Sequence, residues 1–447
     1  MTSAAEFYRL RDRRSLQLGA EVGALNVPVT IRADHRATET AAGQVLITAL
    51  VNMAGRIHRH VTLDVPDASL LVPTLARGTS LIEAVVNTAM AIDPFIDIHV
   101  ARNAPHAGPS IGIGDAAPDS AWHVGASGHR AALARSPLPL TDAPSTLWGA
   151  ALAACLGAAA LFFEVHGQRV EETQVSLWDM SAGPGASVGP PDRGPIDVGT
   201  VAVIGAGAVG VGLCFWLMHI GFVGTWEIVD YDIVELHNTN RSLGFTAADA
   251  GWPDLVPRSK APVAAGLIGA TPKVMRYAEW SRRGGRPDLI LPLANGDGVR
   301  HTIGQRAEPI LLHASTSRNM TAELHRHLPG VDQCISCRFP SRTEPDFECS
   351  TASVAKQGGD HSDDAALPFL SGAAGLMLAA ALEQLPGGPL LTGRPNHWRL
   401  HLDIGPRVIR SMRWTCSSGC SSAIPASVMD RLNSGRRWNT FDPAGHS

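Results

Sequence analysis

The chain has 447 residues, which is too long for one ordinary hydrophobic core and predicts two domains. Hydrophobic residues make up 45% and charged residues 17%, a balance typical of a well-buried globular protein. The net charge of -4 provides no basic field, which argues against nucleic acid as the main partner.

Neither the apolar stretches nor the N-terminus indicates a membrane protein or a secreted one. The longest apolar runs, Trp148–Val165 and Leu370–Leu382, are short and rich in small side chains, so we expect them to be buried helices. The first residues, MTSAAEFYRLRDRRS, carry charges where a signal peptide needs an apolar segment. We therefore expect a cytoplasmic protein without a membrane partner.

Residues 1–180 alternate between strand-like and helix-like segments, which predicts an α/β domain. The strand-like segments are His60–Pro66, Phe95–Ala101 and Ile111–Gly114, and the helix-like ones are Gly43–His58, Thr79–Ala91 and Ser145–Val165. This part of the sequence has no glycine-rich phosphate loop. We interpret the histidine runs His58–His60 and His325–His327 as exposed helix residues in preference to metal ligands.

A Gly- and Pro-rich stretch at 181–199 predicts a linker between two domains. The β-branched run Thr200–Ile204 then predicts a buried parallel strand, followed by a helix over Val209–Ile220 and a second strand over Thr225–Asp230. Strand, glycine turn, helix and strand form a βαβ unit, which predicts a doubly wound sheet of the Rossmann type.

The turn of this βαβ unit reads Gly205-Ala206-Gly207-Ala208-Val209-Gly210, the pattern GxGxxG. Its glycines allow a tight turn and a close approach of the backbone, and the helix N-terminus offers N–H groups to a phosphate. Asp230 at the end of the next strand is placed to accept hydrogen bonds from ribose hydroxyls. These residues predict a dinucleotide or adenosine site.

The residues that follow favour ATP over a nicotinamide cofactor. Asp232, Asn238, Arg241 and Lys260 come next in order, and the amide and cations suit a polyphosphate. Asp297 follows a third strand, expected over 288–293, at the crevice edge where a carboxylate can hold Mg²⁺. The sequence has no GxxxxGK[ST] loop, which argues against P-loop hydrolysis.

The ordered set VIGAGAVG, VDYDIVELHNTNR, a lysine and then Asp297 resembles the ubiquitin-activating superfamily, which includes the sulfur-carrier activating enzymes. The resemblance covers roughly residues 200–420. The family pattern is VDxDxVexxNLxRQ with a later DxxDN. Here Thr239 replaces the Leu, Ser242 the Gln, Asn295 the first acid and Gly298 the last Asn.

The resemblance implies ATP-dependent adenylation of the C-terminal carboxylate of a ubiquitin-like protein. Backbone contacts to the nucleotide would come from Gly205, Gly207 and Gly210, and Asp230 would bind the ribose. Asn238, Arg241 and Lys260 would hold the triphosphate, with Asp232 beside them, and Asp297 would bind Mg²⁺. These cations would neutralise charge as the carboxylate attacks the α-phosphate.

Four of the seven cysteines form two close pairs, Cys334–Cys337 and Cys416–Cys420. Two pairs of this kind can complete a tetrahedral zinc site, while loose thiols or a redox pair are the alternatives. CISCRFP at Cys334–Pro340 resembles the first cysteine motif of the family, whereas the CxxxC spacing departs from the second. Cys155 and Cys214 lie in apolar runs and are expected in the core.

Cys349 lies in the polar stretch ECSTAS, between the first cysteine pair and the apolar run that begins near Leu367. The resemblance implies that a cysteine here forms a thioester with the activated substrate, before transfer to a conjugating enzyme. An ordinary loop cysteine is the alternative.

The resemblance also implies a role for residues 1–180 as a degenerate, inactive copy of the adenylation domain, fused to an active copy at 200–425 and a polar tail at 426–447. In related dimers an arginine from the N-terminal region of the partner reaches the ATP. Arg9, Arg11, Arg13 and Arg14 are candidates, and the sequence does not choose among them.

Three alternatives remain open from the sequence. A sulfur-carrier protein adenylyltransferase would share the ATP site and differ in its protein substrate. An NAD(P)-dependent oxidoreductase would use the glycine loop alone, and would leave Arg241, Lys260 and Asp297 without a common role. A non-catalytic scaffold would bind conjugation proteins but would not exchange pyrophosphate.

Overall fold

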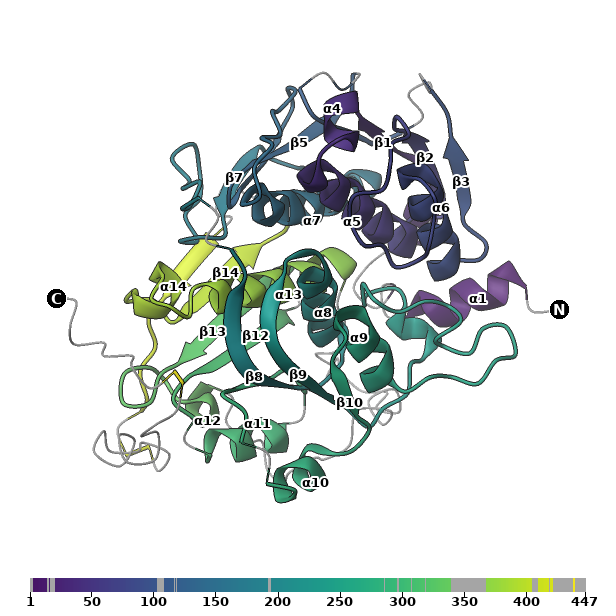
Figure 1. Ribbon diagram of the computed structural model, residues 1–447. Coiled ribbons are helices and arrows are strands. Elements are labelled where there is room, and N and C mark those ends of the chain that lie inside the picture. Colours follow the sequence, from purple (N-terminus) through teal and green to yellow (C-terminus); the bar gives the residue numbers. More distant parts are fainter. Residues whose placement is uncertain are drawn as a thin grey trace.

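We describe the fold from a computed structural model of the chain. The described residues are 3–13, 16, 21–102, 108–115, 117, 119–191, 194–284, 286–295, 297–306, 308–317, 319–338, 367–403, 409–417, 419–420 and 437–438, without the side chain of residue 297. They form two mixed α/β sheets, one in each half of the chain, with the helices between and around them (Figure 1).

The N-terminal half contains a seven-stranded sheet in the order β3-β2-β1-β4-β5-β6-β7. Strands β1 to β5 pair in parallel, and β6 and β7 are antiparallel. The strands are β1 (Val29–Ala33), β2 (His60–Asp64), β3 (Asp97–Val100), β4 (Ser110–Ile113), β5 (Trp122–Ser127), β6 (Arg130–Ala134) and β7 (Thr173–Ser176).

The C-terminal half repeats this order in the sheet β10-β9-β8-β11-β12-β13-β14-β15. Again the first five strands are parallel and the later ones antiparallel, and β15 is an addition at the edge. The strands are β8 (Ile196–Ile204), β9 (Phe222–Val229), β10 (Thr271–Lys273), β11 (Leu289–Pro292), β12 (Leu311–Ser317), β13 (Thr321–His327), β14 (His397–His401) and β15 (Ile409–Met412).

The helices follow the same repeated plan, since α5 and α8 come after the first strand of each sheet, and α7 and α13 precede the last shared strand. They are α1 (Ala4–Arg11), α3 (Val22–Leu25), α4 (His35–Thr38), α5 (Ala41–Ile57), α6 (Leu81–Ile92), α7 (Thr146–Val165), α8 (Ala208–His219), the 3-10 turn η1 (Leu236–Asn238), α9 (Lys260–Ile268), α10 (Tyr277–Arg282), α11 (Asp297–Gly304), α12 (Ile335–Arg338), α13 (Pro368–Glu383) and α14 (Pro389–Thr392).

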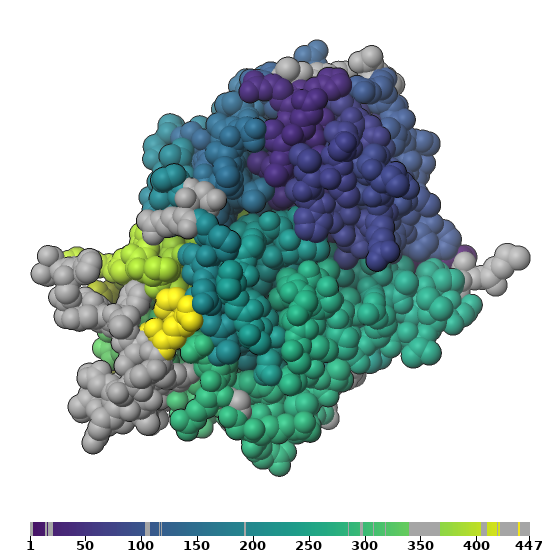
Figure 2. Space-filling view, viewed as in Figure 1, coloured from purple at the N-terminus to yellow at the C-terminus, as the bar shows by residue number. Residues whose placement is uncertain are grey.

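The two halves meet through helices α5, α7, α8 and α13, which lie between the sheets (Figure 1). Small residues let these helices approach closely: Gly372 on α13 lies beside Cys155 of α7 and Met53 of α5. One cluster of buried apolar side chains extends through both halves, and Figure 2 shows the halves in direct contact. Cys155 and Cys214 are buried in this core, as predicted.

Among the described helices, α7 alone is long and apolar enough to cross a membrane by length and composition. Its apolar window is 94% buried between the two halves of the protein. The helix therefore fills the core, as the Ala-rich sequence predicts.

The structure confirms the predicted α/β class and corrects several details of the prediction. Part of the predicted linker at 181–199 packs against the N-terminal half, where the His129 N–H donates to the Val188 carbonyl. The last residues of this stretch already belong to strand β8, which begins at Ile196. Strands β5, β6, β7, β10 and β12 to β15 have no counterpart in the sequence prediction, and neither has the central strand β1. It contains Arg32, which is buried with Asp64 and interrupts the apolar pattern that identifies central strands.

The interpretation of the histidine runs as exposed helix residues is wrong. His325 and His327 lie in strand β13, and both are buried. His58 caps the end of α5 and is buried, while His60 begins β2. Burial lowers the pKa of His325 to about 3 and that of His327 to about 4, so both rings are neutral, and a neutral imidazole is compatible with a buried strand.

Candidate nucleotide-binding site

The glycine loop lies at the carboxyl end of β8, between this strand and helix α8. Gly205 has a φ of +107°, and a Cβ there would lie 2.6 Å from the Ala294 backbone nitrogen. A Cβ on Gly210 would lie 2.2 Å from the Gly205 carbonyl oxygen, so both positions require glycine. A Cβ on Gly207 would meet open space, which leaves this face of the loop accessible to a ligand.

Asp230 follows β9 and holds the glycine loop through its carboxylate. Its Oδ2 accepts a hydrogen bond from the Ala206 N–H at 2.7 Å, and its Oδ1 accepts one from the Asp232 N–H at 2.8 Å. Burial raises the pKa of Asp230, an effect opposed by the positive charge of Lys260 and by these two N–H groups. The predicted ribose acid is therefore adjacent to the glycine loop.

Lys260 lies next to these acids at the start of helix α9. Its Nζ is 3.0 Å from Asp232 Oδ2, and its N–H donates to the Asp232 carbonyl at 2.8 Å. The lysine side chain is only 12% exposed. The structure thus brings together the predicted residues Asp230, Asp232 and Lys260, which are up to 30 residues apart in the sequence.

Asn238 and Arg241 belong to a buried turn that begins with η1. The Asn238 Oδ1 accepts a hydrogen bond from the Glu235 N–H at 2.9 Å, which completes a capping box with Glu235. Arg241 is 8% exposed and donates to the His237 carbonyl at 3.4 Å. Both predicted residues are thus held within the turn.

The predicted magnesium ligand Asp297 is the first residue of α11, directly after β11. This strand pairs with β8, so α11 begins at the same edge as the glycine loop. β8 and β11 are parallel, and between them the order in which successive strands join the sheet reverses, which is where ligands bind in doubly wound folds. Nearby, Arg300 donates to Asn295 Oδ1 at 3.4 Å.

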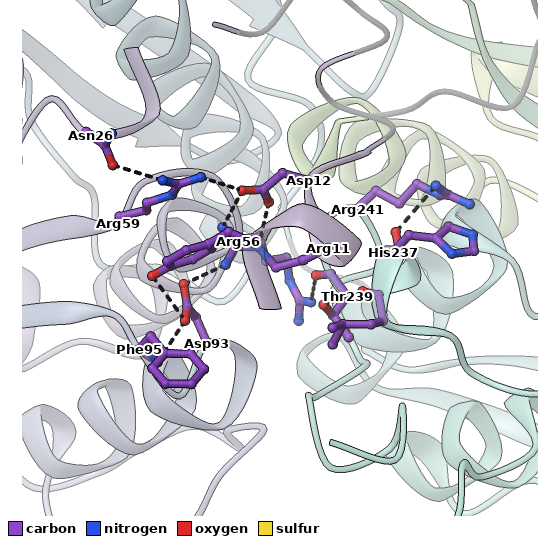
Figure 3. A network of polar contacts seen from close by, with 12 residues as sticks. Arg11, Asp12, Asn26, Arg56, Arg59, Asp93, Phe95, His237, Thr239 and Arg241 are labelled. Atoms are coloured by element: carbon purple, nitrogen blue, oxygen red, sulfur yellow. Dashed lines mark hydrogen bonds and ion pairs between the residues drawn. The ribbon is translucent and has the colours of Figure 1, made fainter. Parts of the chain in front are cut away.

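The structure distinguishes the four candidate arginines near the N-terminus, among which the sequence did not choose. Arg9 is exposed and Arg14 lies outside the described residues. Arg11 is buried, and it contacts Asp12 and Asp93 at 2.6 Å each (Figure 3). Arg13 instead reaches the turn of the C-terminal half: its guanidinium lies 2.6 Å from His237 Nδ1.

Helix α1 is anchored between the two halves and so fixes the direction of Arg13. Phe7 is fully buried and packs edge-on against Phe95 of the N-terminal half and Trp252 of the C-terminal half. Arg59 also binds Asp12 at 3.1 Å (Figure 3). This anchoring depends on contacts between distant segments, which sequence patterns do not reveal.

The two cysteine pairs come together at one place, between α12 and the segment after β15. The four Sγ atoms lie within 4.8 Å of one another, with 3.2 Å between Cys337 and Cys420 and 3.6 Å between Cys334 and Cys420. Tetrahedral zinc with bonds of about 2.3 Å requires sulfurs about 3.8 Å apart. The N–H of Cys337 donates to Cys334 Sγ at 3.3 Å. The donor set therefore fits a structural zinc ion.

A second buried cluster, Glu323 with His325 and His397, does not fit a metal. The two imidazole rings stack at 4.1 Å and within 18° of parallel, so their in-plane lone pairs cannot converge on one ion. Trp414 donates to His397 Nδ1 at 3.1 Å, which places the His397 proton on Nε2, 3.1 Å from Glu323. Arg399 contacts the same carboxylate at 2.9 Å, and we interpret the cluster as a buried ion-pair network.

Cys349, the predicted thioester cysteine, lies outside the described residues. The described chain ends before it at Arg338 and resumes at Leu367, directly before helix α13.

Comparisons with known proteins match each half of the chain. Residues 186–269 match the ThiF family and residues 28–177 match the BilD N-terminal domain. The uncharacterized protein y4jF of Sinorhizobium fredii is 26% identical over 51% of this chain and 44% of its own length.

Two relatives have named activities. The adenylyltransferase and sulfurtransferase MOCS3 of Arabidopsis thaliana is 28% identical over 43% of this chain and 40% of its own length. The sulfur carrier protein adenylyltransferase of Thermus thermophilus is 28% identical over 45% of this chain and 74% of its own length. The chain thus spans less than half the length of the first two relatives.

Solved structures of E. coli MccB also match, one with ATP and one with AMPCPP and MccA. Their TM-scores are 0.37 and 0.38, with 16% identity over 50% of this chain and 66% of MccB. At these TM-scores the likeness adds no weight to the sequence matches. The chain is related to the ThiF/MoeB-type adenylating enzymes, and residues 186–269 are its ThiF family segment.

Proposed function

We propose that this protein uses ATP and Mg²⁺ to adenylate the C-terminal carboxylate of a ubiquitin-like protein that ends in glycine. The observation that carries the proposal is the group of contacts around Asp230. It joins the glycine loop through Ala206 at 2.7 Å, and lies beside Asp232, which binds Lys260 at 3.0 Å. The acid expected to bind the ribose, the glycine loop expected to bind phosphate and a cation are therefore adjacent.

In the proposed reaction, a carboxylate oxygen of the substrate attacks the α-phosphorus of ATP. The bond from the α-phosphorus to the bridging oxygen breaks, and pyrophosphate leaves with both electrons. Lys260, Arg241 and the N–H groups of the glycine loop neutralise the charge that develops on the phosphates. Asp297 would hold Mg²⁺, which supplies further positive charge to the leaving pyrophosphate.

Arg13 is the N-terminal arginine that we assign to this site. It contacts His237, which lies in η1 at the start of the turn that carries Asn238 and Arg241, at 2.6 Å. It also lies 4.0 Å from Glu235, the residue that caps η1. The fused N-terminal half would thus supply from the same chain the arginine that related dimers supply from a partner.

We further propose that residues 1–180 are an inactive copy of the adenylation domain. The strand order and directions are those of the C-terminal half, which supports a common plan. At the corresponding edge, β1 is followed by Asp34 instead of a glycine loop. A cavity of about 280 Å³ there is lined by Asp34, Asp115 and Asp142 as well as Arg36. This predominantly acidic lining would repel a triphosphate.

ATP–pyrophosphate exchange with candidate small proteins ending in Gly-Gly tests the proposal. We expect Asp297→Ala and Lys260→Ala to lower exchange at least 100-fold, in the range seen when single transition-state contacts are removed. Asp288→Ala and Lys273→Ala are the matched controls, because Asp288 precedes β11 at its opposite end and Lys273 pairs with Glu227 on the surface. Exchange that survives in both site variants would refute the assignment. Tight binding of NADH without ATP would favour an oxidoreductase.

The thioester step is the finer part of the proposal. A Cys349 thiolate would attack the carbonyl carbon of the acyl-adenylate, the bond to the phosphate oxygen would break, and AMP would leave. We expect Cys349→Ala to exchange pyrophosphate normally but to form no substrate adduct that a thiol reagent cleaves. A normally charged Cys349→Ala variant would show that the cysteine has no part in the reaction.

A sulfur-carrier protein adenylyltransferase is the second candidate, because one relative has this name and another is named an adenylyltransferase and sulfurtransferase. In that case the acyl-adenylate itself would be the product passed on to a sulfur donor. Wild-type protein that accumulates adenylate without a thioester adduct, together with normal exchange, would favour this candidate.

A further inference from the structure

The turn that carries Asn238 and Arg241 is buried although it has little regular structure. Residues 237–245 are all buried, and beyond the end of η1 they form turns and irregular backbone. Carbonyl groups buried in such a segment need hydrogen-bond donors from elsewhere, because no helix or sheet ladder supplies them.

Those donors come from Arg56, near the end of helix α5 in the N-terminal half. Its NH1 donates to the Thr239 carbonyl (Figure 3). The same NH1 donates to the Phe245 carbonyl at 2.9 Å, and NH2 donates to the Leu243 carbonyl at 2.7 Å. One planar guanidinium therefore binds three carbonyls that flank Arg241 on both sides.

Asn52, one helical turn before Arg56, fixes the guanidinium in this orientation. Its Oδ1 accepts a hydrogen bond from Arg56 Nε at 2.8 Å, and its Nδ2 donates to the Leu243 carbonyl at 3.1 Å. From the opposite side, the Ser371 hydroxyl of α13 donates to the Arg241 carbonyl. The turn is thus hydrogen-bonded both to α5 of the N-terminal half and to α13 of the C-terminal half.

Burial of the Arg56 guanidinium costs more free energy than burial of an apolar side chain at the same place would. Arg56 is 1% exposed, and the four acceptors named above are neutral. Burial, together with the nearby positive charge of Arg11, lowers the pKa of Arg56 to about 9, against a weak opposing effect of Asp249. A buried charge bound to neutral groups adds little stability compared with an apolar side chain, so its value lies in fixing one geometry.

We propose that Arg56 is a positioning residue, through which the N-terminal half sets the geometry of the turn that binds the ATP phosphates. The role rests on the proposed function of Asn238 and Arg241. Arg56 lies behind the turn and acts through its carbonyls, so the half without a glycine loop still contributes to nucleotide binding.

Two variants of Arg56 test this role in the full-length protein. We expect Arg56→Met to weaken ATP binding about tenfold and AMP binding less than about twofold, because AMP lacks the β- and γ-phosphates that the turn would hold. Arg56→Lys keeps the charge but not the planar fork, and should fall between Arg56→Met and wild type. Calorimetry with Mg²⁺-ATP and with AMP provides both affinities.

Arg32→Met is the matched control. Arg32 is also a buried arginine of the N-terminal half, and its NH1 donates to the Asp119 carbonyl at 2.6 Å, away from the turn. We expect thermal stability to fall at least as much as in Arg56→Met, because the ion pair with Asp64 is also lost, but the ratio of ATP to AMP affinity to stay unchanged. Amide hydrogen exchange over residues 238–246 should be faster in Arg56→Met than in Arg32→Met and wild type.

The outcomes separate this inference from the proposed function. An unchanged affinity ratio in both Arg56 variants, with wild-type ATP binding intact, would overturn the role of Arg56 alone. Wild-type protein that binds no ATP would refute the proposed function, and the role of Arg56 with it. If Arg56→Met does not fold, the ratio measured for Arg56→Lys decides the question.

Discussion

Gly207 caps helix α8 and Gly210 lies in its first turn, and the structure treats a side chain at the two positions differently. At Gly210 a Cβ would lie 2.2 Å from the Gly205 carbonyl, a clash with backbone inside the protein. At Gly207 the φ of -73° suits any residue and a Cβ would meet open space. Gly210 therefore serves the fold of the loop, whereas Gly207 leaves room for a ligand.

Two single variants separate these roles. Gly207→Ala should keep the wild-type melting temperature but lose most ATP affinity, because the methyl group occupies space next to the expected phosphates. Gly210→Ala should lower stability by roughly 1–3 kcal/mol, as expected for overpacking. Thermal melts and ATP titrations of both variants check this. ATP binding by Gly207→Ala at wild-type strength would contradict the proposed ligand position.

His58 gives a prediction for the pH dependence of stability. The ring is fully buried, and this burial lowers its pKa to about 3. The unfolded chain binds a proton near pH 6.5 and the folded one does not, so stability is lost as pH falls below about 6.5. The loss is roughly 1.4 kcal/mol per pH unit.

The His58→Leu variant should therefore lose less stability than wild type between pH 7.5 and pH 5.5, by roughly 1.4 kcal/mol. Urea unfolding at the two pH values measures this difference. Ile57→Val is the control, since it removes a buried methylene without removing a titrating group and should act equally at both pH values. Equal pH dependence in His58→Leu and wild type would show that His58 is protonated in the folded protein.

At the scale of elements, helices α8 and α13 are in contact through glycines. A Cβ on Gly375 would lie 2.5 Å from the Leu213 backbone nitrogen, and one on Gly212 would lie 2.8 Å from the Ser371 carbonyl oxygen. These contacts hold the start of α13 next to the helix that follows the glycine loop. Gly266 in α9, by contrast, is exposed with nothing within 4 Å of a Cβ.

Replacement by alanine should change the stability of the protein in opposite directions at Gly375 and at Gly266. Gly375→Ala should destabilise the protein by roughly 1–3 kcal/mol, because the two helices must move apart. Gly266→Ala should stabilise it by roughly 0.5–1 kcal/mol, because alanine is the better helix former and no contact opposes it. Urea midpoints of the two variants provide the comparison, and a change of the same sign in both would contradict the packing described.

The cysteine cluster connects α12 with the segment after β15, which are about 80 residues apart in the sequence. We expect one zinc per chain in protein purified without chelator, because thiolates at these distances complete a tetrahedral site. A strong chelator should lower the melting temperature, since the binding energy of a structural metal contributes to folding. Cys334→Ser should lower the zinc content and Cys155→Ser should not. Metal analysis that finds wild-type protein nearly free of zinc would contradict the site.

At the scale of the whole molecule, one apolar core extends across both sheets. Helix α13 packs against α7 of the N-terminal half as well as α8 of its own half. Neither half can unfold without exposing the apolar surface of the other. The two halves are therefore one cooperative unit, although the chain repeats its fold twice.

We accordingly expect a single unfolding transition. The ratio of calorimetric to van't Hoff enthalpy should be about 1. If Mg²⁺-ATP binds in the C-terminal half, as we propose, it should raise the transition temperature of the entire molecule through mass action. Two separate transitions, of which ATP moves only one, would show that the halves unfold independently.

The sequence alone predicted the features that depend on neighbouring residues. The βαβ unit, the glycine loop, Asp230 and the α/β class follow from local periodicity and turn chemistry, and the structure has the elements within a few residues of their expected bounds. The cysteine pairs were equally visible in the sequence, since cysteines three or four positions apart stay close enough to bind one ion wherever the chain goes. The roles of the site residues in binding and catalysis, from Asp230 to Asp297, Cys349 and the paired cysteines, remain predictions.

Only the tertiary structure decided the features that join distant segments. The sequence did not reveal strand β1, because its buried Arg32 is paired with Asp64 on a neighbouring strand. The histidines of β13 were assigned to an exposed helix, because their burial comes from the strands and helices around them. The selection of Arg13 among four arginines depends on how α1 docks. The role of Arg56 depends on carbonyls more than 180 residues away. A sequence pattern records which side chain is present, but not which distant backbone it meets when the core forms.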